Sequence, residues 1–561
     1  MRSIHFPIRT VLCAFLLHTF SSLTAQIAEQ DEQPHWADPP KLVVGIIVDQ
    51  MRTDLIYRYW NNFGENGFKR LIRDGAFLRD AHFDYSPTYT GPGHASIYTG
   101  TTPAFHGIVG NDMFLRSTGG GLYCAADARM SGIGCEGATG QRSPVNLMST
   151  TIADELERRT AGRSKTIGVS MKDRSAIMPI GRTGDAAYWF AGGTGGHFVT
   201  SSWYRDTLPK WLTEFNAEDR ADLYLKNVWD LKLPSANYQQ VLADDNEFEK
   251  PIPGAASPTL PIDLKPLTAN GTGVLLWTPW GNTITTDVAL AALKGEAMGS
   301  DGITDLLAIS YSSTDMLAHY TGIRSLELED MYIRLDQEIE RLLKELDGSV
   351  GAGECLLFLT ADHGAGDEPE YLRSLKGSAS NFDQRTLEPR IDSTLNANFG
   401  KDKWVIAITN EQVFLNDQAI SAKGLEPARV QRLVADILLK HPLVAYALTA
   451  SDLVSQVYCE GPQRSIQRGF MPQRSGDVCM ALRPGVLDEA DVYEVGKGSA
   501  HGSVWNYDTH VPIIFLGHGI QSGEVLRRIS ITDIAPTVSL IVGMTMPDAS
   551  IGKVITEVIA P

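Results

Sequence analysis

The chain lacks long hydrophobic runs and is short of cysteine and of positive charge. It has 561 residues, of which 6 are cysteine, and its 49 Lys and Arg face 67 Asp and Glu, for a formal net charge of −18. No stretch beyond the N-terminus reaches the ~18 uninterrupted apolar residues that a membrane helix needs. An acidic surface repels nucleic-acid polymers and anionic lipid, so neither is expected as a partner.

The few cysteines exclude one kind of metal site. No pair shows the short C-x-x-C spacing of a thiolate zinc site. Two pairs are close enough in sequence for local disulfides in an oxidising compartment, Cys124 with Cys135 and Cys459 with Cys479. Cys355 falls in an apolar run and is expected to remain a free thiol of the core.

The N-terminus is typical of a secretory signal peptide. Arg2 and Arg9 precede a short apolar stretch, and small Ala25 precedes the expected cleavage. A lipoprotein signal at Cys13 fits poorly because bulky Leu12 stands before it. We therefore expect a signal peptide over residues 1–25, a polar leader over 26–40, and a periplasmic or secreted monomer without a membrane span.

Buried strands alternate with helices in the remainder. Continuous apolar runs predict strands, and the apolar spacing of Met331 to Leu346 predicts an amphipathic helix. Such alternation predicts an α/β fold with a mostly parallel sheet and helices on both faces. The predicted strands are Leu42 to Val48, Asp305 to Tyr311, Cys355 to Thr360 and Val511 to Leu516.

Two regions lack this rhythm, about 180–300 and about 365–500. The first contains several tryptophans among Pro and Gly, and the second contains a strand-like segment from Trp404 to Thr409 and a helical one near Pro427 to Leu439. We interpret both as insertions into a catalytic domain of residues 41–561 that cap the carboxyl edge of its sheet.

Six acids and histidines stand where such a sheet holds ligands. Asp49 and the pair Asp362-His363 each follow a predicted strand, and the carboxyl ends of parallel strands meet at one edge. Asp315 and His319 are four residues apart, which places them on one helix face. His501 lies in a Ser-Ala-His-Gly-Ser turn. Each residue alone is more often a cap or a surface group; together, three Asp and three His suit two zinc ions.

A hydroxyl lies in a segment of small residues, Pro87 to Ser96. Pro92 suits the first turn of a helix, so Thr90 would face free backbone N–H groups at a helix N-terminus. Beside a metal ion that hydroxyl would become a nucleophile. The alternative, which spacing alone favours, is that Thr90 is only an N-cap. His94 falls inside the helix and is expected to be structural.

Phosphate-binding side chains are predicted in two further segments. Lys172 and Arg174 are two residues apart, so in an extended segment they point to one side. Both can bind phosphate, Arg174 through paired hydrogen bonds; the alternative is a solvated surface pair. Asn111 could donate an amide hydrogen bond to a phosphoryl oxygen, or it could be an ordinary loop residue.

Taken together, these motifs resemble the alkaline phosphatase superfamily, and within it the PafA-type branch. The resemblance runs in order through Asp49, Thr90-Gly-Pro-Gly-His-Ala-Ser, Asn111, Lys172-x-Arg174, Asp315-x-x-x-His319, Asp362-His363-Gly and His501-Gly-Ser. It implies a three-layer sandwich and two Zn²⁺ ions. One ion would be held by Asp315, His319 and His501. The other would be held by Asp49, Asp362, His363 and the Thr90 oxygen.

The resemblance also implies a reaction. Thr90 would attack phosphorus and form a phospho-threonine, while Asn111, Lys172, Arg174 and the Gly91 N–H bind the non-bridging oxygens. Two zinc ions nearly balance three aspartates and the Thr90 alkoxide, so Lys172 and Arg174 would match the dianion of a small phosphate monoester. The alternatives are a phosphodiesterase or nucleotide pyrophosphatase of the same superfamily, and a non-catalytic periplasmic protein that binds zinc or glycan.

Overall fold

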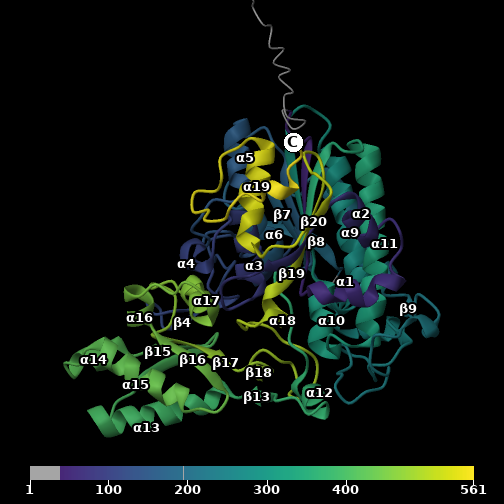
Figure 1. The fold of residues 1–561 in the computed structure, drawn as a ribbon. Helices are drawn as coiled ribbons and strands as arrows, with labels where there is room; N and C mark the ends of the chain where they lie inside the picture. Colours follow the sequence, from purple (N-terminus) through teal and green to yellow (C-terminus); the bar gives the residue numbers. More distant parts are fainter. Residues whose placement is uncertain (1–37, 194) are drawn as a thin grey trace, which may run out of the picture.

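The computed structural model describes residues 38–193 and 195–561. The expected signal peptide, Cys13 and most of the leader lie outside the described residues. Figure 1 shows a main body, in which helices flank a sheet, and a smaller lobe beside it. Within the described ranges, no helix has the length and apolar character that a membrane span requires.

The main body is built on a mixed sheet of 11 strands. From one edge its path runs β20 (Gly523–Val525), β2 (Ala76–His82), β19 (His510–Gly517), β12 (Cys355–Thr360), β1 (Leu42–Val48), β11 (Asp305–Tyr311), β6 (Thr166–Ser170), β7 (Ala186–Ala191), β8 (His197–Ser201) and β5 (Gly132–Ile133), with β21 (Ile529–Ser530) paired to β2. The five strands from β12 to β7 are parallel. The predicted strand Val511 to Leu516 lies within β19 but runs antiparallel to both neighbours, contrary to prediction.

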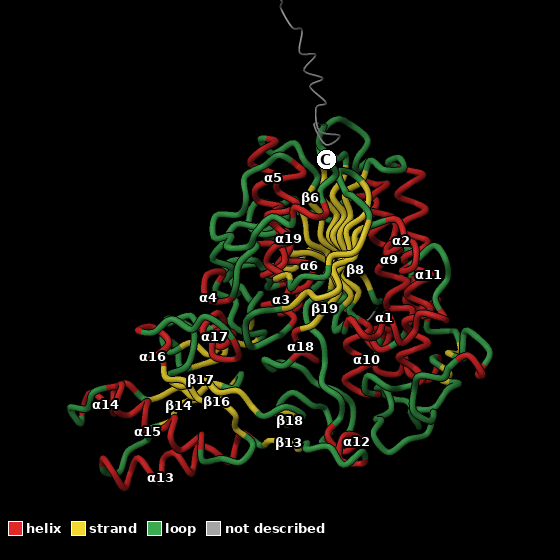
Figure 2. The backbone as a smooth tube through the Cα atoms, in the orientation of Figure 1, coloured by secondary structure: helices red, strands yellow, loops and turns green. Residues whose placement is uncertain are grey.

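Helices cover both faces of this sheet, which confirms the predicted three-layer α/β architecture. One side carries α9 (Pro279–Gly295) and α11 (Leu326–Ser349), and the other carries α3 (Thr90–Thr99), α5 (Ile152–Thr160), α6 (Asp173–Ile180) and α19 (Ile534–Val542) (Figures 1 and 2). The helix predicted from Met331 to Leu346 lies inside α11. Its buried face includes Leu335, Ile339 and Leu342.

The register of the central strands determines where the site forms. All seven residues of β1 are buried between parallel neighbours. Ile47 is paired with Thr360 of β12 and with Ser310 of β11. The residues that follow these three strands must therefore leave the sheet side by side. Each fully buried aliphatic side chain contributes roughly 1.5–3 kcal/mol, so this register is strongly specified.

Much of the region 180–300 is not a cap, contrary to the interpretation above. β7 and β8 belong to the central sheet, and α9 packs on β11. The elements outside the sheet are short: α7 (Lys210–Asn216), α8 (Arg220–Tyr224), β9 (Val228–Trp229) and β10 (Ile262–Asp263). Trp189 of β7 belongs to the core of the main body and is 1% exposed.

The region 365–500 contains a lobe with its own core, which we call the small lobe (residues 380–488). Its antiparallel sheet has the order β14 (Val405–Thr409), β15 (Gln412–Leu415), β17 (Val478–Leu482) and β16 (Val444–Thr449). Helices α13 (Leu387–Phe399) and α15 (Pro427–Leu439) pack on it through Ile391, Val430 and Val434. α17 (Gly461–Gly469) lies on the side toward the main body (Figure 1).

The two predicted disulfides are wrong: the five described cysteines are all free. Cys479 is buried in β17, opposite Gln412 and Leu448 of the adjoining strands, whereas Cys459 is exposed. Cys124 is completely buried, and its thiol packs near the backbone of Gly91. The cysteines of each predicted pair are close in sequence, but their side chains do not form a disulfide. Cys355 is free, as predicted.

Candidate active site

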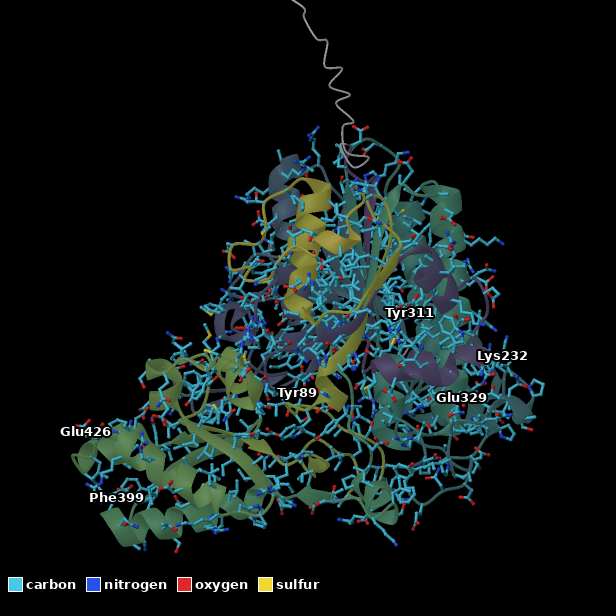
Figure 3. The ribbon with its side chains drawn as sticks, viewed as in Figure 1. Tyr89, Lys232, Tyr311, Glu329, Phe399 and Glu426 are labelled. Atoms are coloured by element: carbon cyan, nitrogen blue, oxygen red, sulfur yellow. The ribbon has the colours of Figure 1, made fainter. Side chains whose placement is uncertain are left out.

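The six predicted ligands converge at the carboxyl ends of the central strands. Asp49 directly follows β1, and Asp362 and His363 follow β12. β11 leads into α10 (Ser313–Thr321), which carries Asp315 and His319 on one face, as predicted. His501 comes from the segment that returns from the small lobe to β19. Figure 3 labels Tyr89, the residue before Thr90, where the main body faces this lobe.

Their ligand atoms form two groups that share one histidine. Oxygen and nitrogen atoms of Asp49, Asp362 and His363 lie within 4.8 Å of one another, and those of Asp315, His363 and His501 do the same. The rings of His363 and His501 stack with centroids 3.5 Å apart. His319 Nε2 is 3.2 Å from Asp315 Oδ1.

Each of the three histidines is oriented by a backbone carbonyl. His319 Nδ1 lies 2.8 Å from the oxygen of Ser499, His363 Nδ1 2.9 Å from that of Gly364, and His501 Nδ1 2.8 Å from that of Thr88. A carbonyl only accepts, so Nδ1 must carry a proton, and Nε2 is the nitrogen that faces the centre. This is the usual arrangement of metal-binding histidines.

The electrostatics of the centre fit divalent cations. Asp49 Oδ1 and Asp362 Oδ2 are buried and have no hydrogen-bond partner in the described part of the chain. Burial, and then the charges of Asp315 and Asp362, raise the pKa of Asp49 well above its usual value. Burial lowers the pKa of His363 and of His501, which keeps both rings neutral and able to bind metal.

Lys172 is part of the centre and not a surface residue. Its Nζ donates to Oδ2 of Asp49 and to Oδ2 of Asp315, each at 2.6 Å. The predicted extended segment is only partly present, because Lys172 is the N-cap of α6 and the helix starts at Asp173. The turn from β6 into α6 therefore brings both basic side chains to the site.

Arg174 is held by a polar network behind the site. Its Nη1 donates to the Tyr123 hydroxyl at 3.3 Å, and its Nε is buried without a hydrogen-bond partner among the described residues. Tyr123 and Arg142 both donate to Asp173. The guanidinium is thus fixed in position while retaining donors for a ligand.

Thr90 is not an N-cap, which removes the alternative that spacing favoured. It is the first residue of α3, and Tyr89 occupies the cap position. Thr90 Oγ1 lies 3.4 Å from Nε2 of His363. His94, one turn along, is structural as expected: its ring contacts the Thr90 carbonyl and the Ser310 hydroxyl, each at 2.9 Å. The positive end of the α3 dipole therefore faces the cluster of candidate metal ligands.

The Gly91 N–H differs from the expected role. It donates to Asn111 Oδ1 at 2.7 Å, so it is already engaged within the protein. This bond orients the Asn111 amide with Nδ2 as its remaining donor group. A Cβ on Gly91 would lie 3.1 Å from that same Oδ1 and 3.0 Å from the Cys124 Sγ, so the glycine permits the contact.

A cavity of about 340 Å³ opens above these groups. Its lining includes Thr90, Asn111, Arg174, Asp315, His319 and His501. It also includes residues 490–493, which the sequence did not indicate. In that loop, Asp491 Oδ2 accepts from the Tyr89 hydroxyl at 3.1 Å, and the Tyr493 ring packs edge-on against His319 with centroids 5.7 Å apart.

Gln50 is a second residue that sequence reasoning missed. Its backbone N–H donates to Asp362 Oδ1 at 3.2 Å, and its Nε2 donates to Asp315 Oδ1 at 2.9 Å. It adopts a left-handed conformation with φ 65°. Such a conformation is uncommon outside glycine and marks a constrained position. Its only sequence signal was its place beside Asp49.

The comparisons with known proteins agree with this geometry. Residues 43–503 match the family described as type I phosphodiesterase / nucleotide pyrophosphatase. Alkaline phosphatase PafA of Elizabethkingia meningoseptica is 39% identical over 523 residues, or 93% of this chain and 94% of that protein. A Myroides odoratus protein named "Calcium-transporting ATPase" is 39% identical over 553 residues, or 98% of both. The crystal structure of wild-type PafA superposes with a TM-score of 0.89 at 38% identity, covering 93% of this chain and 99% of that one.

The family match spans most of the chain, and the PafA match includes nearly the whole of both chains. The non-catalytic alternative does not account for a relationship of this extent to a phosphatase. The chain therefore belongs to the type I phosphodiesterase / nucleotide pyrophosphatase family of the alkaline phosphatase superfamily, and it is a phosphatase in the class of phosphate monoester hydrolases.

Proposed function

We propose that this phosphatase is an exported two-zinc enzyme that hydrolyses small phosphate monoesters through a phospho-threonine on Thr90. The observation that carries the proposal is that a cavity of about 340 Å³ is lined by Thr90, Arg174 and residues of the buried Asp and His centre. Lys172 is bonded to two carboxylates of that centre. Because every described site residue comes from one chain, a monomer would suffice for the reaction.

The metal ligands follow the two groups of side chains. Asp315, His319 and His501 would hold one zinc ion, and Asp49, Asp362, His363 and the Thr90 oxygen the other, with His363 close to both groups. When bound, the two ions supply Lewis acidity to the oxygens that enter and leave phosphorus. The ligand chemistry, imidazole with carboxylate and no thiolate, suits zinc.

The chain's own residues perform the remaining steps. The Thr90 oxygen forms a bond to phosphorus on the side opposite the ester oxygen, whose bond to phosphorus breaks as the alcohol departs. Water then attacks the phospho-threonine, and phosphate leaves with the Thr90 hydroxyl restored. The N-terminus of α3 favours negative charge near Thr90 in both steps.

Preference for monoesters would come from the cations. Arg174, fixed by Tyr123, and Asn111, fixed by the Gly91 N–H, both line the cavity. Lys172 adds a second, buried positive charge, bonded to Asp49 and Asp315. Two cations match a dianionic monoester better than a singly charged diester, and the second ester group of a diester would crowd Arg174.

Arg174→Ala tests this discrimination. The rate with an aryl phosphate monoester should fall about 10²–10³-fold, whereas the rate with the corresponding diester should change much less. Arg129→Ala, which removes a largely exposed arginine, is the matched control. Lys172→Ala is a poorer test, since it also breaks contacts with two proposed metal ligands. Equal losses for both esters would refute the discrimination argument.

Phosphoenzyme trapping tests the nucleophile. Acid quenching of the enzyme with radiolabelled substrate should label the wild type but not Thr90→Ala, while elemental analysis of both should give two zinc ions per chain. Label that persists in Thr90→Ala would assign the nucleophile elsewhere. N-terminal sequencing of the exported protein would test cleavage before Gln26.

Diester hydrolysis is the second candidate, because the matching family is named for type I phosphodiesterases. The monoester to diester rate ratio of the wild type decides between them. A ratio below one would make the chain a diesterase that shares the metal centre and Thr90.

A further inference from the structure

A second polar cavity, of about 270 Å³, lies between α17 of the small lobe and the main body. Basic side chains surround it: Arg464 and Arg468 from α17, and His82, Arg527, Arg528 and Lys553 from the main body. None of these residues takes part in the site described above. Its volume lies near the lower end of the roughly 300–1,000 Å³ of ligand pockets.

The positive charge of this cavity is unusual for a chain with a net charge of −18. Its lining contains five Lys and Arg but only two acids, Asp84 and Asp533. Asp84 is paired with Arg464 and Arg468. Asp533 accepts backbone N–H groups of Ser530 and Lys553 at 3.2 and 2.7 Å. The two acids supply at most two negative charges against five positive ones, so the lining keeps a net positive charge.

Two of the cations remain available to a ligand. Arg527 forms an ion pair with Glu557, but the side chains of Arg528 and Lys553 form no ion pair with any described residue. Arg468 also retains a donor, since its buried Nε has no hydrogen-bond partner among the residues described. The cavity thus offers two exposed charges and one buried donor to the same space.

We propose that this cavity binds a small phosphate-bearing anion with two or more negative charges. Arg528 and Lys553 would supply charge, and Arg468 would supply directed hydrogen bonds. Inorganic phosphate is the smallest such ligand and, on the proposed function, the product of the reaction. The volume also admits a longer anion with more than one phosphate group.

A bound anion would link the two lobes near the nucleophile. Arg464 and Arg468 are one turn apart on α17 of the small lobe, whereas Arg528 and Lys553 belong to the main body. α17 also contacts the main body through its Ser465 carbonyl, which accepts from the Ser86 N–H at 3.1 Å. Ser86 begins the segment that leads to Thr90. Anion binding should therefore hold α17 against the main body.

The test is a calorimetric titration of zinc-loaded protein with inorganic phosphate and then with tripolyphosphate. All proteins carry Thr90→Ala to prevent turnover. The first variant adds Arg528→Ser and Lys553→Ser, both of which replace exposed residues and should leave folding intact. The matched control adds Lys401→Ser and Lys403→Ser, which remove the same charge from an exposed part of the small lobe.

The parent protein, which carries only Thr90→Ala, and the control should each bind phosphate at two sites, the candidate active site and the second cavity. The first variant should bind phosphate only at the candidate active site, because each lost cation weakens binding in the second cavity about tenfold. Amide hydrogen exchange in α17 should slow with the ligand only in the parent and the control. Binding of tripolyphosphate but not phosphate at the second site would identify the longer anion. Equal stoichiometry and equal exchange in all three proteins would overturn the proposal, whatever the outcome of the activity assays.

Discussion

Lys172 and Asp49 form a buried ion pair in which Nζ and Oδ2 are 2.6 Å apart. The same ammonium is 2.6 Å from Asp315 Oδ2. Asp49 is 0%, Asp315 2% and Lys172 6% exposed. Lys172 is therefore a candidate phosphate ligand and also the cation that compensates two proposed metal ligands from within the protein.

The stability of the folded protein should depend on Lys172 much more strongly after the metal is removed. In chelator-treated protein, Lys172→Ala removes the ammonium group from buried Asp49 and Asp315, and breaking such an arrangement typically costs about 3–5 kcal/mol. In zinc-loaded protein the ions supply that charge, so the loss of stability should be much smaller. Urea denaturation with chelator and with zinc measures both values.

Lys294→Ala, which removes a largely exposed lysine paired with Glu345, is the control for this comparison. Its effect should be below about 1 kcal/mol with or without metal. An equal effect of Lys172→Ala in both conditions would show that Lys172 does not share the carboxylates with the metal ions.

Gly93 should be intolerant of substitution because α3 lies directly against the ligand-bearing strand end. A Cβ at position 93 would lie 2.3 Å from the Asp362 carbonyl oxygen and 2.8 Å from its Cβ. Gly93→Ala must therefore shift α3 away from Asp362 and with it the Thr90 hydroxyl. We expect a loss of activity of at least about 10²-fold, measured as kcat/KM.

Gly91→Ala is the internal comparison for Gly93. Its added Cβ would lie 3.0 Å from the Cys124 Sγ and 3.1 Å from the Asn111 Oδ1, two side-chain atoms that can shift more easily than the backbone that a Cβ at position 93 would meet. Its loss of kcat/KM should be clearly smaller than that of Gly93→Ala. The reverse order would mean that Asn111, not the position of α3, limits the reaction.

Gln50 should tune metal affinity without being a ligand. It donates to carboxylates of both proposed metal groups, Asp362 and Asp315. The Asp315 bond comes from the side chain, so Gln50→Ala removes it, and loss of such an outer contact typically weakens metal binding about 10–100-fold. Competition with a zinc chelator measures the change, and Gln240→Ala, at an exposed position, should show none. Unchanged affinity in Gln50→Ala would limit its role to folding.

The sequence predicted the centre of the fold well because the evidence there was local. Strands β1, β11 and β12 are mostly apolar, and the ligands stand directly after them or one helix turn beyond. Parallel pairing then brings Asp49 and Asp362 together without further information. The same local evidence predicted Asp315 and His319 on one face of α10.

What the sequence missed depends on contacts between distant segments. The direction of β19 is set by its pairing with β2 and β12, which its own apolar pattern does not report. The loop of Asp491 and Tyr493 meets the site only because the small lobe folds back on the main body. Gln50 adopts a left-handed backbone conformation, which a glutamine in the sequence does not predict. The cysteine pairs failed for the same reason, since closeness in sequence does not determine which side chains face each other.

Glu157 should make stability fall as pH rises from about 4.5 to 7. It is 7% exposed on α5 and accepts the Thr166 hydroxyl at 2.7 Å. Burial, opposed by this hydrogen bond, raises its pKa from 4.5 to about 7. The folded protein therefore keeps a proton that the unfolded chain releases across this window. Its stabilising effect is complete below the unfolded pKa and is lost as pH rises through the folded one.

Glu157→Gln isolates this effect because the amide oxygen can still accept from Thr166 and cannot ionise. The free energy of unfolding is measured for the variant and for the wild type at each pH. The difference, variant minus wild type, should increase by roughly 3 kcal/mol from pH 4 to pH 8. Glu214→Gln on the exposed surface of α7, with a side chain that is 64% exposed, should change with pH as the wild type does. A constant difference in free energy of unfolding between Glu157→Gln and the wild type across this range would contradict the prediction. The carboxyl would then have to be ionised in the folded protein already at low pH. A buried negative charge beside Thr166 would in that case need a compensating cation.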